Sequence, residues 1–147
     1  NEAKEYKNLT SAIAKNLPLL KSNTLYILED WASPSRKGTL NDLAALYSGK
    51  VKFVSYNTWK DAILSREKGI AYHMSVPIAT GSDRSKPGSG GYNFHHYIMD
   101  AESGVILGLV NPKVAVSMGP VPVDKGNTFV VNEDIMKKLE KIYIGKD

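Results

Sequence analysis

The chain has 147 residues, of which 42% are hydrophobic, and 19 Lys and Arg against 15 Asp and Glu give it a formal net charge of +4. It contains no Cys, which excludes a disulfide framework, a thiol nucleophile, a CxxC redox pair and zinc sites built on thiolates. A chain of this length buries roughly two thirds of its unfolded surface. We therefore expect a single domain over residues 1–147 that needs no metal to fold.

No apolar run approaches the roughly 20 residues that a membrane span needs, so we expect no membrane insertion. The chain begins Asn1-Glu2-Ala3, without an initiator Met. This start fits a mature protein that has lost a secretory signal, or a domain of a longer chain. Because export also agrees with the absence of thiols, we expect a periplasmic or secreted location, with the cytoplasm as the alternative.

The first elements are a helix and a buried strand. Apolar residues at spacings of three and four predict an amphipathic helix over residues 2–20, which Pro18 should end near Asn16 or Leu17. The next segment, 24–28, reads Thr-Leu-Tyr-Ile-Leu and has no polar alternation. Such a segment is typical of a strand covered on both faces, so we place it at the centre of an α/β sheet.

Two strand and helix units follow each other. A loop over 32–38 leads to a helix from residue 40, with Thr39 as its cap and Asp42 returning a hydrogen bond to the Thr39 amide. A second strand is predicted over 51–56, and a second helix should be capped by Asn57 or by Thr58 with Asp61. Two such units favour parallel strands joined by right-handed crossovers.

The third part of the chain predicts an antiparallel meander. Strands are expected over 70–79, 92–100 and 104–110, with Gly104 in the last turn. In the first of them the positions of Ile70, Tyr72 and Met74 are expected to face the core and His73 to lie opposite. Pro77 should place its end of that strand at an edge or a bulge.

Three further segments complete the chain. The Gly-rich and Ser-rich range 80–91 is either a lid or partner-binding tip, or a tolerated insertion. The range 111–124 suggests an extended segment that pairs at an edge. A final helix should begin at Asn132, with acidic residues in its first turn and lysines later.

These elements predict an α/β fold. We expect a single-layer mixed sheet in which two parallel β-α units precede an antiparallel meander, with helices on both faces and a C-terminal helix. Ligands of such sheets bind outside the carboxyl ends of the parallel strands. The predicted ligand-binding residues at these ends are Asp30, Ser33, Ser35, Arg36, Lys37, Thr39 and Asn57.

The chemistry of this rim favours an anionic or polar ligand. Two helix N-termini, three hydroxyls and two cations would each attract negative charge. The alternative is that Arg36 and Lys37 are solvated and that Asp30 only stabilises its own turn. Neither GxxxxGK[ST] nor GxGxxG is present, so no phosphate-loop motif supports the site.

The histidines suggest a second candidate site. His95 and His96 must point to opposite faces, and period-two counting places Asp100 on the His96 side. A cluster of His73, His96 and Asp100 could serve as acid and base or as metal ligands. No HExxH or other metal spacing is present, so we predict neither a metal site nor a cofactor.

We expect a binding or accessory module rather than an enzyme, with a small molecule or a protein as its partner. The alternative is a hydrolase-like enzyme that uses Asp30 or the His73, His96 and Asp100 cluster. A perturbed histidine or carboxylate in a pocket would favour the enzyme, and a flat apolar patch would favour the partner-binding module. The lysines form no block, so nucleic-acid binding is not favoured.

Overall fold

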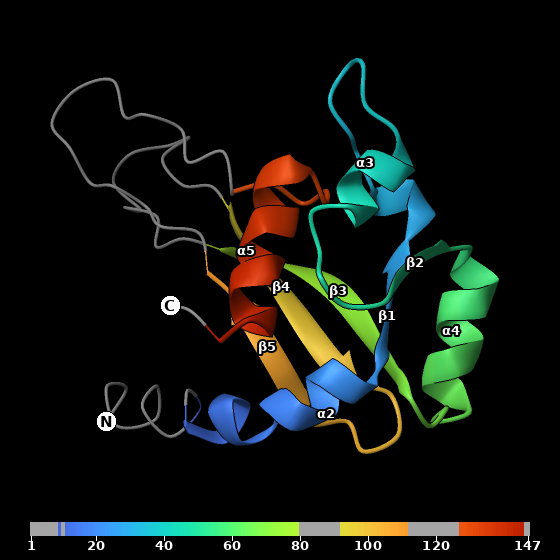
Figure 1. Ribbon diagram of the computed structural model, residues 1–147, viewed down its shortest axis with the longest axis vertical. Helices are drawn as coiled ribbons and strands as arrows, with labels where there is room; N and C mark the ends of the chain where they lie inside the picture. Colours follow the sequence, from blue (N-terminus) through green and yellow to red (C-terminus); the bar gives the residue numbers. More distant parts are fainter. Residues whose placement is uncertain (1–8, 10, 80–91, 112–126, 146–147) are drawn as a thin grey trace, which may run out of the picture.

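The computed structural model describes residues 9, 11–79, 92–111 and 127–145 (Figure 1). Its strands form one sheet in the order β2-β1-β3-β4-β5. The strands β2, β1 and β3 are parallel to one another, and β4 pairs antiparallel with both β3 and β5. The bounds are β1 Thr24–Leu28, β2 Val51–Val54, β3 Ile70–Ala79, β4 Tyr92–Asp100 and β5 Ile106–Val110. The α/β class, the mixed sheet and the central position of β1 are confirmed.

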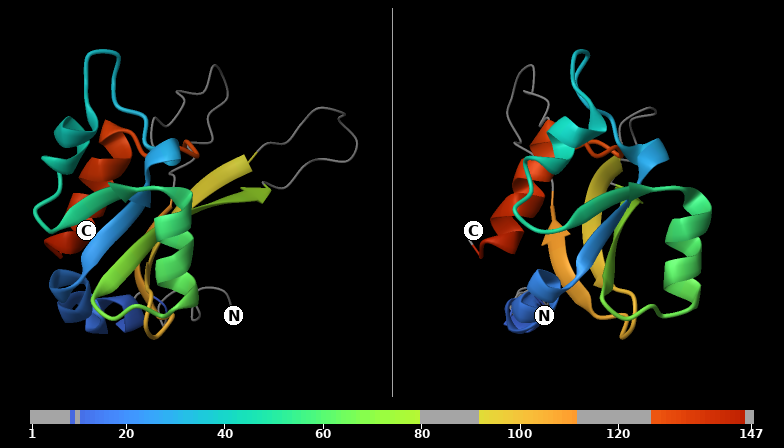
Figure 2. Two further views of the ribbon diagram at one scale, coloured as in Figure 1. Left: turned by 90° about the vertical axis from the view of Figure 1, so that its right-hand side faces the viewer. Right: turned by 45° about the vertical axis from the view of Figure 1, so that its right-hand side comes forward.

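Helices cover both faces of the sheet. Helix α4 lies on one face, and α2, α3 and α5 lie on the other (Figure 2). The bounds are α2 Leu17–Ser22, the 3₁₀ turn η1 Glu29–Trp31, α3 Leu40–Ala44, α4 Tyr56–Leu64 and α5 Glu133–Tyr143. Among the described residues, no helix has the length and apolar character that crossing a bilayer requires.

The larger core lies on the α5 side of the sheet. There the strands contribute Leu25, Ile27, Ala71 and Ile98, which pack against the buried face of α5. The α4 side holds a smaller cluster around Ala62 and Tyr72. The expectation that His73 lies opposite the core was therefore wrong. Both faces of β3 are apolar enough to be covered, and the side with Ala71 and His73 meets the larger group of helices.

Helix starts follow local hydrogen bonding. The predicted capping box of α3 is confirmed, because Thr39 and Asp42 exchange side-chain and backbone bonds. The cap of α4 was predicted wrongly at Asn57 or Thr58. Ser55 takes this role and accepts from the Thr58 amide at 3.2 Å, so β2 ends at Val54 and not at residue 56. Ser55, two residues before Asn57, is an equally good capping residue for the first turn of the helix.

The predicted end of the first helix near Asn16 is confirmed, but a second helix begins directly after it. Residues 11–15 are helical, Asn16 is a turn, and α2 starts at Leu17 with the proline in its first turn. Proline is tolerated there because a first-turn amide has no partner inside the helix. Asn132 caps α5 as predicted, since its side chain accepts from the Ile135 amide at 2.9 Å.

The β3–β4 pair extends beyond the end of β1. Strand β1 pairs with β3 only as far as Tyr72, whereas β4 pairs with β3 up to Ala79. Pro77 lies in this extension, opposite Phe94, so its missing N–H faces the side that β1 has left open, as the edge prediction required. Gly104 has φ +77° in the turn before β5, which begins at Ile106 and not at residue 104. The predicted connection 80–91 and the segment 112–124 lie outside the described residues.

Candidate functional site

The strand order places the crossover reversal between β1 and β3. The chain moves from β1 to β2 on one side and then returns past β1 to β3 on the other. In open α/β sheets, ligands bind at the carboxyl ends of the strands where this reversal occurs. The rule therefore points to the ends of β1 and β3, and not to the ends of β1 and β2 that the sequence suggested.

The seven predicted rim residues draw on helices from both faces of the sheet. Thr39 caps α3 and Asn57 lies in the first turn of α4, and these two helices lie on opposite faces (Figure 2). Asp30 is exposed in η1, and Arg36 and Lys37 are exposed in a turn. The Ser33 amide donates to the Val131 carbonyl at 2.8 Å, which ties the loop to the segment before α5.

The protein's own carboxylates occupy two amides of this loop. The Ser35 amide donates to Glu133 Oε2 at 2.7 Å, and the Thr39 amide donates to Asp42 Oδ2 at 2.8 Å. Hydrogen bonding from Ser35 lowers the pKa of Glu133 below its usual value, so this group is ionised at neutral pH. The positions expected to attract an anionic ligand already hold anionic side chains.

A buried pair of histidines lies at the crossover reversal. His73 of β3 and His96 of β4 are both 0% exposed, and their rings stack with centroids 5.0 Å apart. His73 Nε2 lies 2.8 Å from His96 Nδ1, and His96 Nε2 lies 2.7 Å from the Thr128 carbonyl oxygen. Ser75 is opposite His96 in the strand register, so the two histidines are diagonal neighbours on one face.

These contacts determine where the protons are. A carbonyl oxygen can only accept, so His96 donates from Nε2 to Thr128. In the neutral ring its Nδ1 then carries a lone pair, which accepts the Nε2 proton of His73. The remaining nitrogen, His73 Nδ1, is an unprotonated acceptor, and it is buried without a hydrogen-bond partner in the described part of the chain.

Burial keeps both histidines neutral. Desolvation lowers the pKa of His73 well below 6.5, and the neighbouring His96 lowers it further. Desolvation also lowers the pKa of His96 to about 4. The hydrogen bond to Thr128 opposes this change, while the charge of Lys138 adds to it. Both rings are therefore uncharged at neutral pH, in the proton arrangement just described.

A group of aromatic rings adjoins the pair at His73. Trp31 follows β1, and its ring centroid lies 4.9 Å from Phe129, 5.9 Å from Trp59 and 6.3 Å from His73. We call Trp31, Trp59, His73, His96 and Phe129 the switch-point cluster. Trp59 comes from α4 and Phe129 from the segment before α5, and the contacts of Trp31 with both rings join the two faces of the sheet at the end of β1.

Backbone contacts hold the two tryptophans in place. Trp59 Nε1 donates to the His73 carbonyl oxygen at 3.0 Å, at the point where β1 no longer pairs with β3. Trp31 precedes Ala32, which forms a parallel bridge with Val131, and the Val131 amide donates to the Trp31 carbonyl at 2.7 Å. The indole of Trp59 is thus bonded to β3, and the backbone of Trp31 is bonded to the segment before α5.

A second unpartnered polar atom lies on the same strand face. Ser75 is 6% exposed, and its Oγ has no hydrogen-bond partner among the described residues. It is two residues from His73, and side chains at this spacing point to the same side of a strand. Buried polar groups are nearly always hydrogen-bonded, so two atoms on one strand face that have no partner among the described residues need an explanation.

Asp100 does not belong to this cluster. It lies four residues from His96 on the same face, about 13 Å along the strand. Its carboxylate accepts from Asn23 Nδ2 at 2.8 Å and from the Ser103 amide at 2.9 Å, which stabilises the turn into β5. The predicted three-residue cluster was therefore wrong, and the described residues contain no group of three or more potential metal ligands among His, Asp and Glu.

Sequence reasoning missed Trp31, Trp59 and Phe129. The available signal was the position of Trp31 directly after a buried strand, together with the fact that the chain has only two Trp. Phe129 gave no signal, because nothing in the local pattern links it to Trp31. Comparison of the chain with protein-family models, curated proteins and solved structures gave no match.

Proposed function

We propose that the protein is a binding module that takes a small neutral ligand at the switch-point cluster. The ligand would offer an N–H or O–H donor to His73 Nδ1 and a flat apolar body to the rings of Trp31 and Phe129. The observation that carries this proposal is the buried Nδ1 of His73, which has no hydrogen-bond partner among the described residues and which the hydrogen bonds of the two rings leave as an acceptor.

The proton arrangement selects against anions. A lone pair accepts hydrogen bonds, and a carboxylate or phosphate dianion has no proton to donate. Burying an unpaired charge beside two neutral imidazoles would also cost several kcal/mol. In the neighbouring loop, the amides of Ser35 and Thr39 already donate to Glu133 and Asp42. These observations favour a neutral ligand over the anionic one expected from sequence.

The surrounding groups suit a ring-shaped molecule. Small-molecule sites are mostly apolar and aromatic with a few polar groups that fix orientation. Here aromatic rings make up most of the cluster, and Ser75 Oγ supplies a second polar atom that can donate or accept. A phenol or a similar hydroxylated ring offers both an apolar ring for the aromatic side chains and a hydroxyl group for the polar atoms.

The two tryptophans make a direct test possible. The chain has only two Trp, and both belong to the cluster, so two indole N–H signals in a ¹H–¹⁵N spectrum report on the site. Phenol should shift both signals saturably, whereas anisole, which lacks a donor, and benzoate, which is anionic, should bind at least about tenfold more weakly. The His73→Phe variant should lose this preference for phenol, and Asp30→Asn should keep it.

Several results would contradict the proposal. Binding of benzoate as tight as that of phenol would show that the acceptor does not select the ligand. Shifts confined to residues away from the two indoles would place the site elsewhere. No saturable shift with phenol at millimolar concentration would remove the small-molecule site.

The same hydrogen bonds favour a second candidate, in which His73 is a general base. A ring held by Thr128 through His96 is oriented to accept a proton from a bound O–H group. This enzyme would hydrolyse p-nitrophenyl acetate faster than buffer, and His73→Gln would remove the excess rate. The matched control is His95→Gln, which removes a partly exposed histidine on the other face. Equal rates in both variants would exclude a catalytic role of His73.

A further inference from the structure

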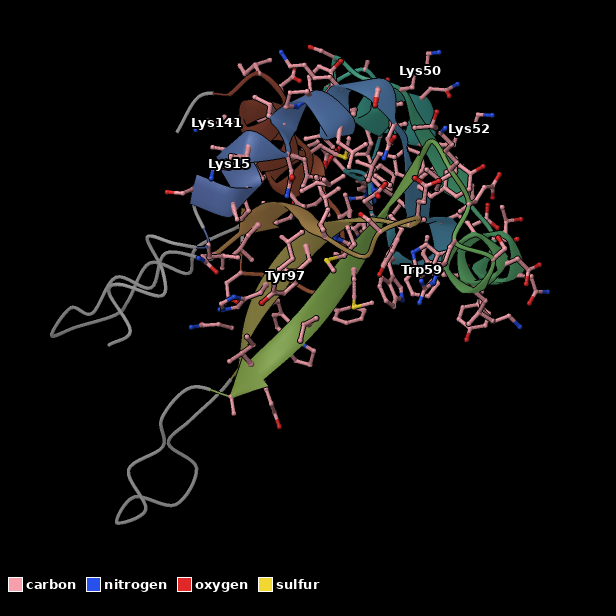
Figure 3. All side chains as sticks on the ribbon, turned by 90° about the horizontal axis from the view of Figure 1, so that it is seen from below. Lys15, Lys50, Lys52, Trp59, Tyr97 and Lys141 are labelled. Carbon is pink, nitrogen blue, oxygen red and sulfur yellow. The ribbon has the colours of Figure 1, made fainter. Side chains whose placement is uncertain are left out.

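Lysines that are far apart in the sequence meet at the end of the sheet where β1 and β2 begin. Lys15 precedes α2, Lys21 lies in its last turn, Lys50 precedes β2, and Lys141 lies in the last turn of α5. All four side chains are exposed, and we call them the lysine surface. Figure 3 labels three of them, Lys15, Lys50 and Lys141, along one side of the molecule.

Contacts at the C-terminal end of α5 bring these segments together. Lys21 Nζ lies 5.8 Å from the centroid of the Tyr143 ring. Gly49, directly before Lys50, approaches the same ring so closely that a Cβ atom on it would lie 2.6 Å from Tyr143 Cε2. Helices α2 and α5 are also in contact with each other. The lysine surface is therefore grouped around Tyr143, although its members come from three distant parts of the sequence.

Carboxylates do not neutralise this surface. None of the four lysines forms an ion pair within the described part of the chain. Glu140 of α5 accepts from the Ser48 amide at 3.0 Å and from the Ser48 hydroxyl, so its carboxylate is already engaged. The exposed Glu29 and Asp30 follow β1 and lie at the opposite end of that strand. Glu67 is flanked in the sequence by a cation on each side. The lysine surface thus attracts anions.

An apolar side chain projects beside these lysines. Ile144 directly follows α5 and is 44% exposed, and the neighbouring Tyr143 is partly exposed. Lysines around exposed apolar side chains suit the boundary between the headgroups and the acyl chains of a bilayer, where tyrosine is also enriched. The lysine surface contains no Arg, which is the usual residue for recognition of bases and phosphates in nucleic acids. The combination favours a membrane surface over a nucleic acid.

We propose that the lysine surface adsorbs the protein to membranes with anionic phospholipid headgroups, and that Ile144 enters the headgroup region. The net charge of +4 acts in the same direction, because it attracts the whole chain to such a membrane. The protein lies on the bilayer in this contact, which requires no helix that spans it. The switch-point cluster at the other end of β1 then points away from the bilayer. This proposal does not depend on the small-molecule site.

Cosedimentation of the full chain with lipid vesicles tests the adsorption. The protein should bind vesicles of phosphatidylglycerol and phosphatidylcholine in equal parts, and rising salt should release it. The double variant Lys21→Gln with Lys141→Gln should bind about 30-fold more weakly, at about fivefold for each lysine. The matched control is Arg36→Gln with Lys37→Gln. It removes the same charge from an exposed turn after β1, at the other end of the sheet, and should weaken binding less.

Further variants separate the possible causes of weaker binding. Lys15→Gln with Lys50→Gln removes the other two lysines and should repeat the loss, and the far-ultraviolet circular dichroism of each variant should match the wild type. Ile144→Gln keeps the charge and should weaken binding to vesicles at least about threefold, because it removes apolar contact with the headgroup region. It should leave any binding to a short DNA duplex unchanged.

Several results would overturn the proposal. One is equal binding to vesicles of phosphatidylcholine alone, which carry no net charge. Another is equal weakening by the lysine pairs and by the control at Arg36 and Lys37, which would assign the attraction to net charge rather than to this surface. Tighter binding to the duplex than to the anionic vesicles, or no effect of Ile144→Gln on vesicle binding, would point to a nucleic acid instead.

Discussion

His73 Nε2 and His96 Nδ1 lie 2.8 Å apart between two antiparallel strands, and neither ring reaches solvent. Two imidazoles at this distance can share only one proton in a hydrogen bond. Because the single ring N–H of neutral His96 donates to the Thr128 carbonyl oxygen, the proton shared by the two rings is the Nε2 proton of His73, and His73 Nδ1 is left as a free lone pair among the described residues. This atom is both the acceptor in the proposed site and the place where an additional proton must bind.

The direction of the pair can be observed by nuclear magnetic resonance. Long-range ¹H–¹⁵N spectra at neutral pH should show both rings protonated at Nε2 and unprotonated at Nδ1. His95 is the internal reference, since it lies on the opposite face and in neither hydrogen bond. A proton found at Nδ1 of either buried ring would show that the hydrogen bonds run in another direction.

Acid should destabilise the fold through the same rings. Their pKa values are lower in the folded protein than in the unfolded chain, for His96 about 4 against 6.5. The unfolded chain therefore binds protons more readily between these values. The stability is complete above about pH 6.5 and is lost as the pH falls toward about 4, by up to about 3 kcal/mol for His96.

Urea unfolding at several pH values between 7.5 and 4 measures this loss. The wild type should lose more free energy of unfolding over this range than His96→Gln, since carboxylate protonation affects both proteins alike. The glutamine can still donate to Thr128, which makes it the milder substitution. If the two proteins lose the same free energy, the buried pair does not account for the acid sensitivity.

The fold could be predicted from sequence where the signal was local. The bounds of β1, β3 and β4 follow directly from runs of strand-forming residues. The cap of α4 could not be predicted in this way, because Ser55, Asn57 and Thr58 are all good capping residues and only packing selects one of them. The order of the strands was also out of reach, because the pairing of β1 with β3 joins residues more than 40 positions apart.

Only part of the candidate site could be predicted from the sequence. Period-two counting placed His73 and His96 on one face, but their contact depends on a register that the strands themselves do not encode. The same counting placed Asp100 on that face and gave no distance along the strand. Trp31 and Phe129 are brought together by the bridge between Ala32 and Val131, and no periodic pattern reports a single bridge of this kind.

Trp59 should stabilise the fold through its indole N–H. The Trp59→Phe variant keeps an aromatic ring but leaves the His73 carbonyl oxygen without its partner, which should lower the free energy of unfolding by about 1–3 kcal/mol. Trp31→Phe is the matched control, because the Trp31 indole N–H makes no hydrogen bond in the described part of the chain. Urea unfolding followed by circular dichroism compares both variants. If Trp31→Phe lowers the free energy of unfolding as much as Trp59→Phe, the effect comes from the smaller ring and not from the lost hydrogen bond.

Gly108 should be required where β5 passes under α5. A Cβ atom at this position would lie 2.9 Å from Ile142 Cγ2 and 3.4 Å from Ile98 Cδ1. Such overpacking between a strand and a helix should lower the free energy of unfolding of Gly108→Ala by about 1–3 kcal/mol. Removing the obstructing atom with Ile142→Ala should relieve part of this cost, so the double variant should lose less than the sum of the single losses.

The control for this cycle is Gly69→Ala. No atom lies within 4 Å of a Cβ at Gly69, but the residue has φ +84°, so its substitution should cost about 1 kcal/mol through backbone strain alone. That cost should simply add to the cost of Ile142→Ala, because the two positions share no contact. If the losses of Gly108→Ala and Ile142→Ala also simply add, the close approach of β5 and α5 is not the reason that glycine is required at position 108.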